Sequence, residues 1–257
     1  MVVKRILITR HGFRANWAGE QPPADAARYP DIPLSIHGEK QAAELRDYLK
    51  GSNQAIDLVV SSPFVRCVQT VEPVASNLNL DIWPEWYGKN RNGAEDSQPA
   101  PLHLLHDIFP AVTASYETIE VPNPDGEGIA DLYDRSERVL SALISRLDED
   151  LRKPRTVLIC THAATFVALC RVLAGQRPED PTMTDFVPYT TCLTVFERNK
   201  SPGSPVGSWV CTQNGDCSFL SAGRQRGWRF SGKESFDSKV PKHGVDAGTG
   251  LGVVVED

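Results

Sequence analysis

Two histidines and three arginines follow short apolar runs that have the composition of buried strands. The first run is followed by Arg10, His11 and Arg14, the second by Arg66 and the third by His162. Arginine presents a planar fork of donors that fits phosphate oxygens, and its charge does not depend on pH. Several such forks around an imidazole form a cradle for a phosphate group. The pattern therefore predicts phosphoryl chemistry.

The expected chemistry is attack on phosphorus by a ring nitrogen of His11. Positive neighbours disfavour the imidazolium form, so the arginines keep His11 neutral and nucleophilic. In-line attack gives a phosphohistidine, which water then hydrolyses. His162 is expected to donate a hydrogen bond to the equatorial oxygens as charge develops there. Each residue alone has an ordinary structural explanation, and the prediction depends on their joint occurrence.

The elements that must position these residues alternate between strands and helices. Runs rich in β-branched and aliphatic residues predict buried strands over 6–9, 56–61 and 156–161, and a fourth strand over 190–196. This alternation predicts an α/β fold, a three-layer α/β/α sandwich with a mostly parallel central sheet. Such sheets bind ligands at the carboxyl ends of their strands. The five residues above lie at those ends.

Helix signals follow the predicted strands. Ser35 is expected to cap a helix that ends near Gly51, and a later helix is expected to end at Gly175. The clearest helix is predicted over 129–151, where apolar residues up to Leu151 recur at spacings of three, four and seven.

The helix that carries Arg66 has its own predicted start. Ser62 and Pro63 form an N-cap and N1 pair, which places Arg66 in the first turn, where free backbone N–H groups also favour an anion. Pro73 is expected to kink or split this helix.

Composition limits the classes of partner. The chain has 257 residues, a net charge of −6 and a pI of about 5.6, so it has no overall basic field for nucleic acid or an anionic membrane. No segment reaches the roughly 18 apolar residues of a membrane span, and the apolar start is too short for a secretory signal. We expect a soluble protein of the cytoplasm or the nucleus. Six cysteines without CxxC pairs argue against zinc and a disulfide framework, so no metal or cofactor is expected.

The organisation along the chain predicts one main domain with additions. We assign the domain to 1–200, with a polar, Pro-rich insertion over the site at 88–124. A β-rich appendage is predicted over 201–230, followed by a flexible tail over 231–257. The appendage is either structural or a docking surface.

Three segments resemble the signatures of the histidine phosphatase superfamily, also called phosphoglycerate-mutase-like. The resemblance covers about residues 3–197 and rests on Ile-Thr-Arg10-His11-Gly12, Ser62-Pro63-Phe64-Val65-Arg66-Cys-Val-Gln-Thr and Cys-Thr161-His162-Ala163. It implies His11 as nucleophile, His162 as catalytic partner, and Arg10, Arg14 and Arg66 (with His162) as phosphate ligands.

Some positions depart from parts of that superfamily. Arg14 and the absence of an acidic residue at Phe13 differ from the mutase and small-phosphatase pattern. Ala163 stands where the acid-phosphatase and phytase branch has Asp, so the general acid must come from elsewhere. The chain most resembles the phosphatase domains of the suppressor-of-T-cell-receptor-signalling proteins and the fungal phosphatase-like domain of an RNA polymerase III transcription factor C subunit.

Two glutamates are candidates for the proton donor. In those relatives a Glu-Trp pair after the arginine helix supplies the acid, and Glu85-Trp86-Tyr87 resembles that pair. A carboxylic acid beside aromatic rings is suited to general acid work. Glu127, which resembles the Gly-Glu-Ser segment of the family, is the reserve candidate. The alternative for Glu85 is an aromatic loop that packs on the sheet, and for Glu127 a charge at a helix N-terminus.

Three functions fit these observations. The first is a metal-independent phosphomonoesterase that works through a phosphohistidine on His11. The second is a phosphatase-fold interaction subunit of a larger assembly, such as a transcription factor complex, because a fold alone supports either role. The third is a phosphoglycerate-type mutase. The expected partner is a phosphorylated small molecule or phosphopeptide, with no direct nucleic acid or membrane contact, and a protein partner or a homodimer stays open.

Overall fold

A six-stranded sheet forms the centre of the computed structural model, which describes residues 3–20, 31–52, 54–85, 99–123, 127–199 and 204–232. The strand order is β3-β2-β4-β1-β5-β6. The strands are β1 (Arg5–Arg10), β2 (Leu58–Ser61), β3 (Ile82–Pro84), β4 (Thr156–Thr161), β5 (Leu193–Arg198) and β6 (Trp209–Asp216).

Four neighbouring strands run parallel. β1 pairs with β4, β4 with β2, and β2 with β3 in parallel register, whereas β5 is antiparallel to β1 and β6 to β5. The carboxyl ends of the parallel strands therefore meet at one edge of the sheet. Within this register Arg10 pairs with Thr161, and Ser61 with Cys160. The segments that begin at His11, Ser62 and His162 consequently leave the sheet side by side.

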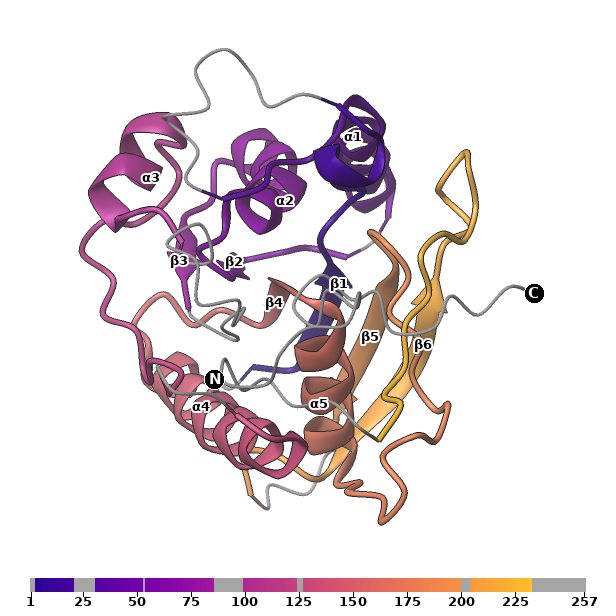
Figure 1. Ribbon diagram of the computed structural model, residues 1–257. Coiled ribbons are helices and arrows are strands. Elements are labelled where there is room, and N and C mark those ends of the chain that lie inside the picture. Colours follow the sequence, from indigo (N-terminus) through magenta and orange to yellow (C-terminus); the bar gives the residue numbers. More distant parts are fainter. Residues whose placement is uncertain are drawn as a thin grey trace.

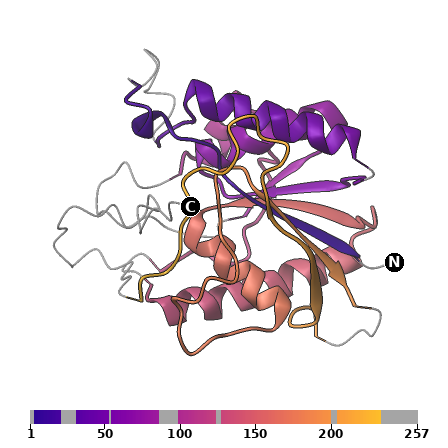
Figure 2. The ribbon, with the colours of Figure 1, turned by 90° about the vertical axis from the view of Figure 1, so that its right-hand side faces the viewer.

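Helices cover both faces of the sheet. Helices α1 (Ile36–Gly51), α2 (Val65–Leu78) and α3 (Leu102–Ile108) lie on one side, and α4 (Ile129–Glu149) and α5 (Ala163–Ala174) lie on the other (Figures 1 and 2). A short 3₁₀ turn, η1 (Ala15–Trp17), follows β1. The predicted three-layer α/β/α sandwich is confirmed.

The strand residues alternate between two apolar cores. Ile6 and Ile8 belong to the core under α4 and α5, whereas Leu7 belongs to the core under α1 and α2. All three side chains are buried, as expected for a strand covered on both faces. Burial on both faces fixes the orientation of β1 and therefore the position of His11, which follows it.

Two predicted helix ends are confirmed and one is wrong. The Ser35 hydroxyl accepts a hydrogen bond from the Gly38 amide at 3.0 Å, and Gly175 ends α5 with φ of 68°. α4 ends at Glu149 rather than at residue 151. Asp150 leaves the helical backbone conformation with ψ of 131°, so that Leu151 is 93% exposed.

The start of α2 also differs from the prediction. Phe64 is the N-cap and provides no side-chain cap; instead the Asp31 carboxylate accepts a hydrogen bond from the Val65 amide at 2.9 Å. A distant residue thus supplies the anion at this helix N-terminus, and Ser62 is left for another contact. Pro73 lies inside α2 and does not split it.

The boundary regions contain more regular structure than predicted. α3 lies within the predicted insertion over 88–124, and β6 of the predicted appendage is the sixth strand of the sheet. Residues 86–98, which include Trp86 and Tyr87, and the tail from 233 lie outside the described residues. The division at residue 200 stays a prediction. No helix in the described ranges has both the length and the apolar character needed to cross a membrane.

Gly38 allows the loop after β1 to approach α1 closely. A Cβ at Gly38 would lie 2.1 Å from the Phe13 carbonyl oxygen, a backbone atom that cannot turn aside. We expect Gly38→Ala to lower the free energy of unfolding by about 1–3 kcal/mol and to weaken phosphate binding, because Phe13 precedes Arg14. Gly51→Ala in the same helix is the control, since nothing lies within 4 Å of its Cβ position. Chemical denaturation compares the two, and equal stability would contradict the prediction.

Candidate active site

His11 is held directly after β1 by its backbone and by one ring nitrogen. Its amide donates to the Thr161 carbonyl at 3.0 Å. Its Nδ1 lies 2.9 Å from the Gly12 carbonyl oxygen, which can only accept, so Nδ1 carries the proton. Nε2 of the neutral ring therefore has a free lone pair. This is the nitrogen that a nucleophilic role requires.

His162 faces His11 across the edge of the sheet. The two ring centroids are 5.6 Å apart. His162 Nδ1 lies 3.2 Å from Nη2 of Arg66, which can only donate, so Nδ1 accepts and the ring proton is on Nε2. Nε2 lies 2.8 Å from the hydroxyl of Ser62, the contact that Ser62 makes in place of the predicted cap. A donor is thus directed along the edge where β2 and β4 end.

The three predicted arginines are buried around these rings. Arg10, Arg14 and Arg66 expose 3% or less of their surface. Arg10 Nη1 donates to the carbonyls of Pro188 and Arg226. Within the described part of the chain, Arg10 Nε and Nη2 and Arg66 Nε are buried without an acceptor. Buried donors without a partner cost free energy unless a ligand satisfies them, and an anion with several oxygens does so.

The electrostatic neighbourhood keeps both imidazoles neutral. Burial, and then the charges of Arg14, Arg10 and Arg66, hold the pKa of His11 well below its ordinary value. The pKa of His162 is also lowered, mainly by burial. Burial lowers the pKa of Arg10 to about 10, which leaves its guanidinium charged at neutral pH. Neutral imidazoles surrounded by cations are the combination that the sequence predicted.

Asp31 belongs to this cluster and was not found from the sequence. Its carboxylate lies 3.4 Å from Arg66 Nη1 and is 4% exposed. Burial raises its pKa to about 6, against the opposing charge of Arg66. No strand or helix signal precedes Asp31, so only the folded chain brings it to the start of α2.

Residues 6–207 match the family model described as the histidine phosphatase superfamily, branch 1. The chain belongs to the histidine phosphatase superfamily. The predicted membership is confirmed, and the matched region includes all five residues of the two histidines and three arginines.

The chain is similar in sequence to proteins that are named for different functions. The chain is 31% identical over 260 residues to the transcription factor tau 55 kDa subunit of Saccharomyces cerevisiae. The alignment covers 90% of this chain and 59% of the yeast protein. The chain thus spans less than two thirds of that relative. It is 26% identical over 196 residues to a 2,3-bisphosphoglycerate-dependent phosphoglycerate mutase of Pelagibacter ubique, covering 65% of this chain and 79% of the mutase.

A solved structure shows the same fold. The ecdysone phosphate phosphatase of Bombix mori, in complex with tungstate, aligns with a TM-score of 0.58 and 18% sequence identity. The alignment covers 83% of this chain and 97% of that one.

Glu85 lies at the same edge of this histidine phosphatase fold, one residue beyond β3. Pro84 pairs with Ser61 of β2, so β3 is two strand spacings, roughly 10 Å, from β4, which carries His162. The buried carboxyl group accepts hydrogen bonds from Tyr116 Oη at 2.7 Å, Thr118 Oγ1 at 2.5 Å and the Ile119 amide at 3.0 Å. The side chain is thereby fixed in orientation.

Glu127 has a different environment. Its carboxylate forms a bidentate ion pair with Arg135, in which Nη2 lies 2.8 Å from Oε2 and Nε contacts Oε1. Arginine binds the carboxylate form in this geometry. Glu127 is consequently occupied in a structural contact at the start of α4.

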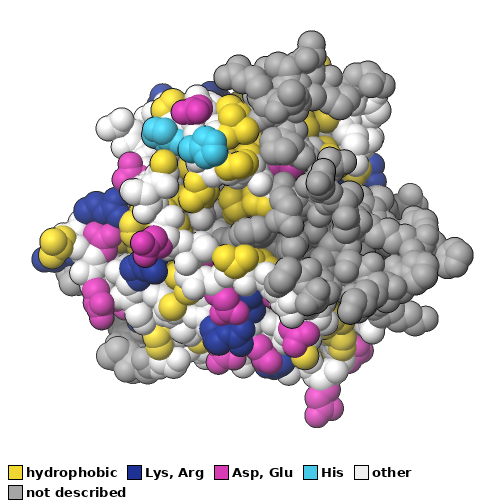
Figure 3. All heavy atoms as spheres, turned by 60° about the vertical axis from the view of Figure 1, so that its left-hand side comes forward, with side chains coloured by type: hydrophobic (Ala, Val, Ile, Leu, Met, Phe, Trp, Pro, Cys, Tyr) yellow, Lys and Arg dark blue, Asp and Glu magenta, His cyan; other side chains and the backbone are white. Residues whose placement is uncertain are grey.

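An apolar hollow of ≈ 350 Å³ adjoins the end of β3. It is lined by Pro63, Pro84, Pro99, Ala100, Pro101, Leu102, Thr118 and Val121. Thr118 connects it to Glu85 through the hydrogen bond described above. On the α3 side of the molecule, hydrophobic side chains reach the surface between polar ones (Figure 3).

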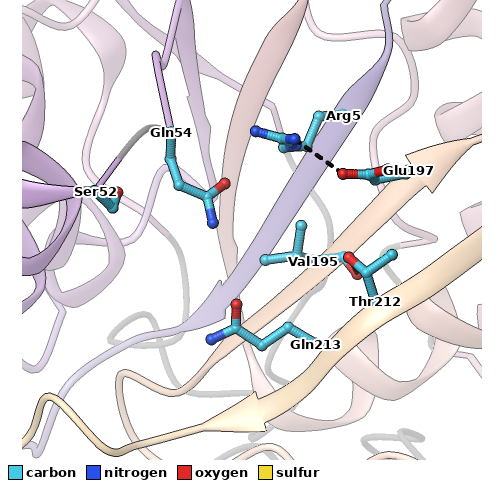
Figure 4. A pocket seen from close by; sticks show the side chains of 7 residues that line it. All are labelled: Arg5, Ser52, Gln54, Val195, Glu197, Thr212 and Gln213. Atoms are coloured by element: carbon cyan, nitrogen blue, oxygen red, sulfur yellow. Dashed lines mark hydrogen bonds and ion pairs between the residues drawn. The ribbon is translucent and has the colours of Figure 1, made fainter.

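A second hollow, of ≈ 310 Å³, lies at the other end of β1. Among the described residues that line it, the one cation is Arg5, which is paired with Glu197 at 2.9 Å (Figure 4). Because Arg5 begins β1 and its charge is neutralised, this hollow is separate from the histidines and is not an anion site.

Proposed function

We propose that the protein is a metal-independent phosphomonoesterase in which His11 is phosphorylated transiently. The observation that carries this proposal is the pair of neutral imidazoles, 5.6 Å apart, beside buried donors of Arg10 and Arg66 that have no acceptor among the described residues. A phosphoryl group between the rings would satisfy those donors. Family membership supports the same chemistry.

In the proposed first step, His11 Nε2 attacks phosphorus in line with the leaving oxygen. A P–N bond forms as the P–O bond to the leaving group breaks, and the negative charge moves to that oxygen. Arg10, Arg14 and Arg66 balance the charge of the equatorial oxygens. The His162 Nε2–H then donates its hydrogen bond to one of these oxygens in place of the Ser62 hydroxyl.

Glu85, in its protonated form, gives the leaving oxygen its proton. Tyr116 and Thr118 can accommodate both forms of this carboxyl group, because a hydroxyl donates to a carboxylate and accepts from a carboxylic acid. In the second step, Glu85 takes a proton from water, the water oxygen attacks phosphorus, and the P–N bond breaks. Phosphate leaves and His11 is neutral again.

A second candidate function is favoured by one similarity. The relation to the yeast tau 55 kDa subunit covers 90% of this chain, so a role as an interaction subunit of a transcription factor assembly is the alternative. The two roles are compatible in one chain. A mutase role is less favoured, because Phe13 and Arg14 differ from the mutase pattern. Conversion of a phosphorylated acid into its isomer, without free phosphate, would support the mutase.

Hydrolysis of simple phosphomonoesters tests the proposal. We expect the protein to release inorganic phosphate from phenyl phosphate in the presence of excess chelator, and vanadate to inhibit it by occupying the same donors. Loss of activity on chelation would contradict the metal-independent mechanism. Absence of any turnover across a panel of phosphometabolites and phosphopeptides would remove the enzyme and leave the interaction subunit.

The lowered pKa of His11 predicts the acidic side of the pH profile. An ordinary histidine gains a proton as the pH falls through about 6.5, whereas His11 stays neutral there. After correction for substrate ionisation, kcat/KM should therefore show no His11 titration between pH 8 and 6.5. Stability has the matching sign: below about pH 6.5 the unfolded chain binds protons that native His11 and His162 do not, so the free energy of unfolding falls as the pH falls. Protonation of the His11 ring above pH 6.5, followed by NMR with His11→Ala to assign the signal, would contradict the prediction.

A further inference from the structure

Trp17 connects the phosphate site to a fourth arginine. The indole ring centroid lies 5.8 Å from the His11 ring, and the guanidinium carbons of Arg10, Arg14 and Arg226 lie 5.5, 5.0 and 4.9 Å from it. Trp17 Nε1 is buried without an acceptor within the described residues. One aromatic side chain thus carries an unsatisfied donor and contacts three cations.

The segment that supplies Arg226 is anchored inside the site. The Arg226 carbonyl accepts from Arg10 Nη1 at 2.5 Å. The Gln225 side-chain oxygen accepts from Gln41 Nε2 at 3.0 Å and from His37 at 2.6 Å. Gln41 in turn accepts from the Phe13 amide at 2.9 Å. The position of Arg226 is therefore coupled to the loop that carries His11.

The backbone of Arg226 supports a specific placement. Its φ of 52° is in the left-handed region, which is uncommon for a residue other than glycine. Such a conformation persists where surrounding contacts determine it, and it is frequent at ligand sites. Arg226 lies outside the region 6–207 that matches the family model, so that match does not account for it.

Arg226 adds a positive charge at the edge of the cluster that contains Arg10, Arg14 and Arg66. Within the described ranges, the guanidinium of Arg226 contacts the Phe13 and Trp17 rings and forms no ion pair. Arg226 is partly exposed, whereas the other three arginines are buried, which places it at the rim.

We propose that Arg226, held on Trp17, binds a second acidic group that the substrate carries close to its phosphate. The inference rests on the proposed function, since it assumes that the phosphate lies between His11 and His162. The substrate class is a phosphomonoester with a neighbouring carboxylate or phosphate. Specificity for that class then comes from the C-terminal segment.

Binding of matched non-hydrolysable anions tests this inference without turnover. Isothermal titration at pH 8 compares methylphosphonate with phosphonoacetate, which adds one carboxylate, and with methylenediphosphonate, which adds one phosphonate. We expect wild type to bind phosphonoacetate, methylenediphosphonate or both more tightly than methylphosphonate. Arg226→Gln should reduce this preference about tenfold, and Arg226→Lys should retain most of it.

Arg224→Gln is the matched control. Arg224 is exposed two residues earlier and its guanidinium lies 5.5 Å from the Tyr189 ring centroid, away from Trp17. The preference should survive this change. The inference is overturned if wild type shows no preference, if Arg226→Gln weakens all three ligands equally, or if both variants lose the preference alike, as a diffuse field would cause. Hydrolysis of phenyl phosphate by wild type, measured in parallel, reports separately on the proposed function.

Discussion

Replacement of His11 by alanine is expected to reduce phosphate release by at least about 10⁴-fold. The variant lacks the nitrogen that forms the P–N bond. His162 does not substitute for it, because its Nδ1 accepts from Arg66 and its Nε2 carries the proton. Initial rates with phenyl phosphate measure the loss.

Trapping gives the covalent evidence for the same prediction. Rapid acid-free quenching of wild type during turnover should yield phosphate on His11 by mass spectrometry, and the alanine variant should yield none. His103→Asn, at an exposed position of α3, is the control histidine and should behave like wild type. Equal turnover by wild type and His11→Ala would exclude the phosphohistidine mechanism.

The sequence was sufficient for the parts of the site that follow parallel strands. His11, Arg66 and His162 are close in sequence to β1, β2 and β4, and buried strands are recognisable by their composition. Because the carboxyl ends of parallel strands share an edge, the approximate proximity of these residues follows from topology alone. Family signatures at the same positions pointed to the same residues.

The contacts that complete the site depend on distant parts of the chain. Asp31 reaches the start of α2 from a loop, and Arg226 reaches Arg10 from beyond β6. Neither residue has a periodic or strand-end signal, since each is placed by tertiary packing rather than by its own element. Trp17 could not be assigned from the sequence for the same reason, because its contacts with Arg10, Arg14 and Arg226 exist only in the folded chain.

The prediction for the start of α2 failed for a related reason. Ser62 and Pro63 have the right local chemistry for an N-cap, but the Asp31 carboxylate satisfies the first amide of the helix instead. Ser62 then contacts His162. A local rule was overridden by a buried anion that a sequence window does not contain. β3 was missed because three residues are too short a run for periodicity, although it positions Glu85.

Glu85→Gln is expected to slow hydrolysis of esters with poor leaving groups by about 10²–10⁴-fold. An alkoxide leaving group needs a proton, whereas 4-nitrophenolate leaves without one. The loss should therefore be large with an alkyl phosphate and small with 4-nitrophenyl phosphate. Steady-state kcat/KM values for the two substrates give the ratio, because this parameter covers the steps up to departure of the leaving group and excludes the later hydrolysis of the phosphohistidine. Thermal denaturation checks that the hydrogen bonds from Tyr116 and Thr118 still hold the amide.

Glu127→Gln separates the two candidate acids. This change breaks the buried bidentate pair with Arg135, so it should lower the free energy of unfolding by up to about 3 kcal/mol. Its rates should fall with both substrates alike or not at all, because Glu127 is engaged at the start of α4 by an ion pair. If Glu127→Gln showed the dependence on leaving group and Glu85→Gln did not, the assignment would be reversed.

A protein that requires an acid at Glu85 must place the leaving group beside β3, and the apolar hollow bordered by Pro84 and Thr118 lies there. The leaving-group dependence of Glu85→Gln therefore also indicates the direction in which the substrate extends from the phosphate.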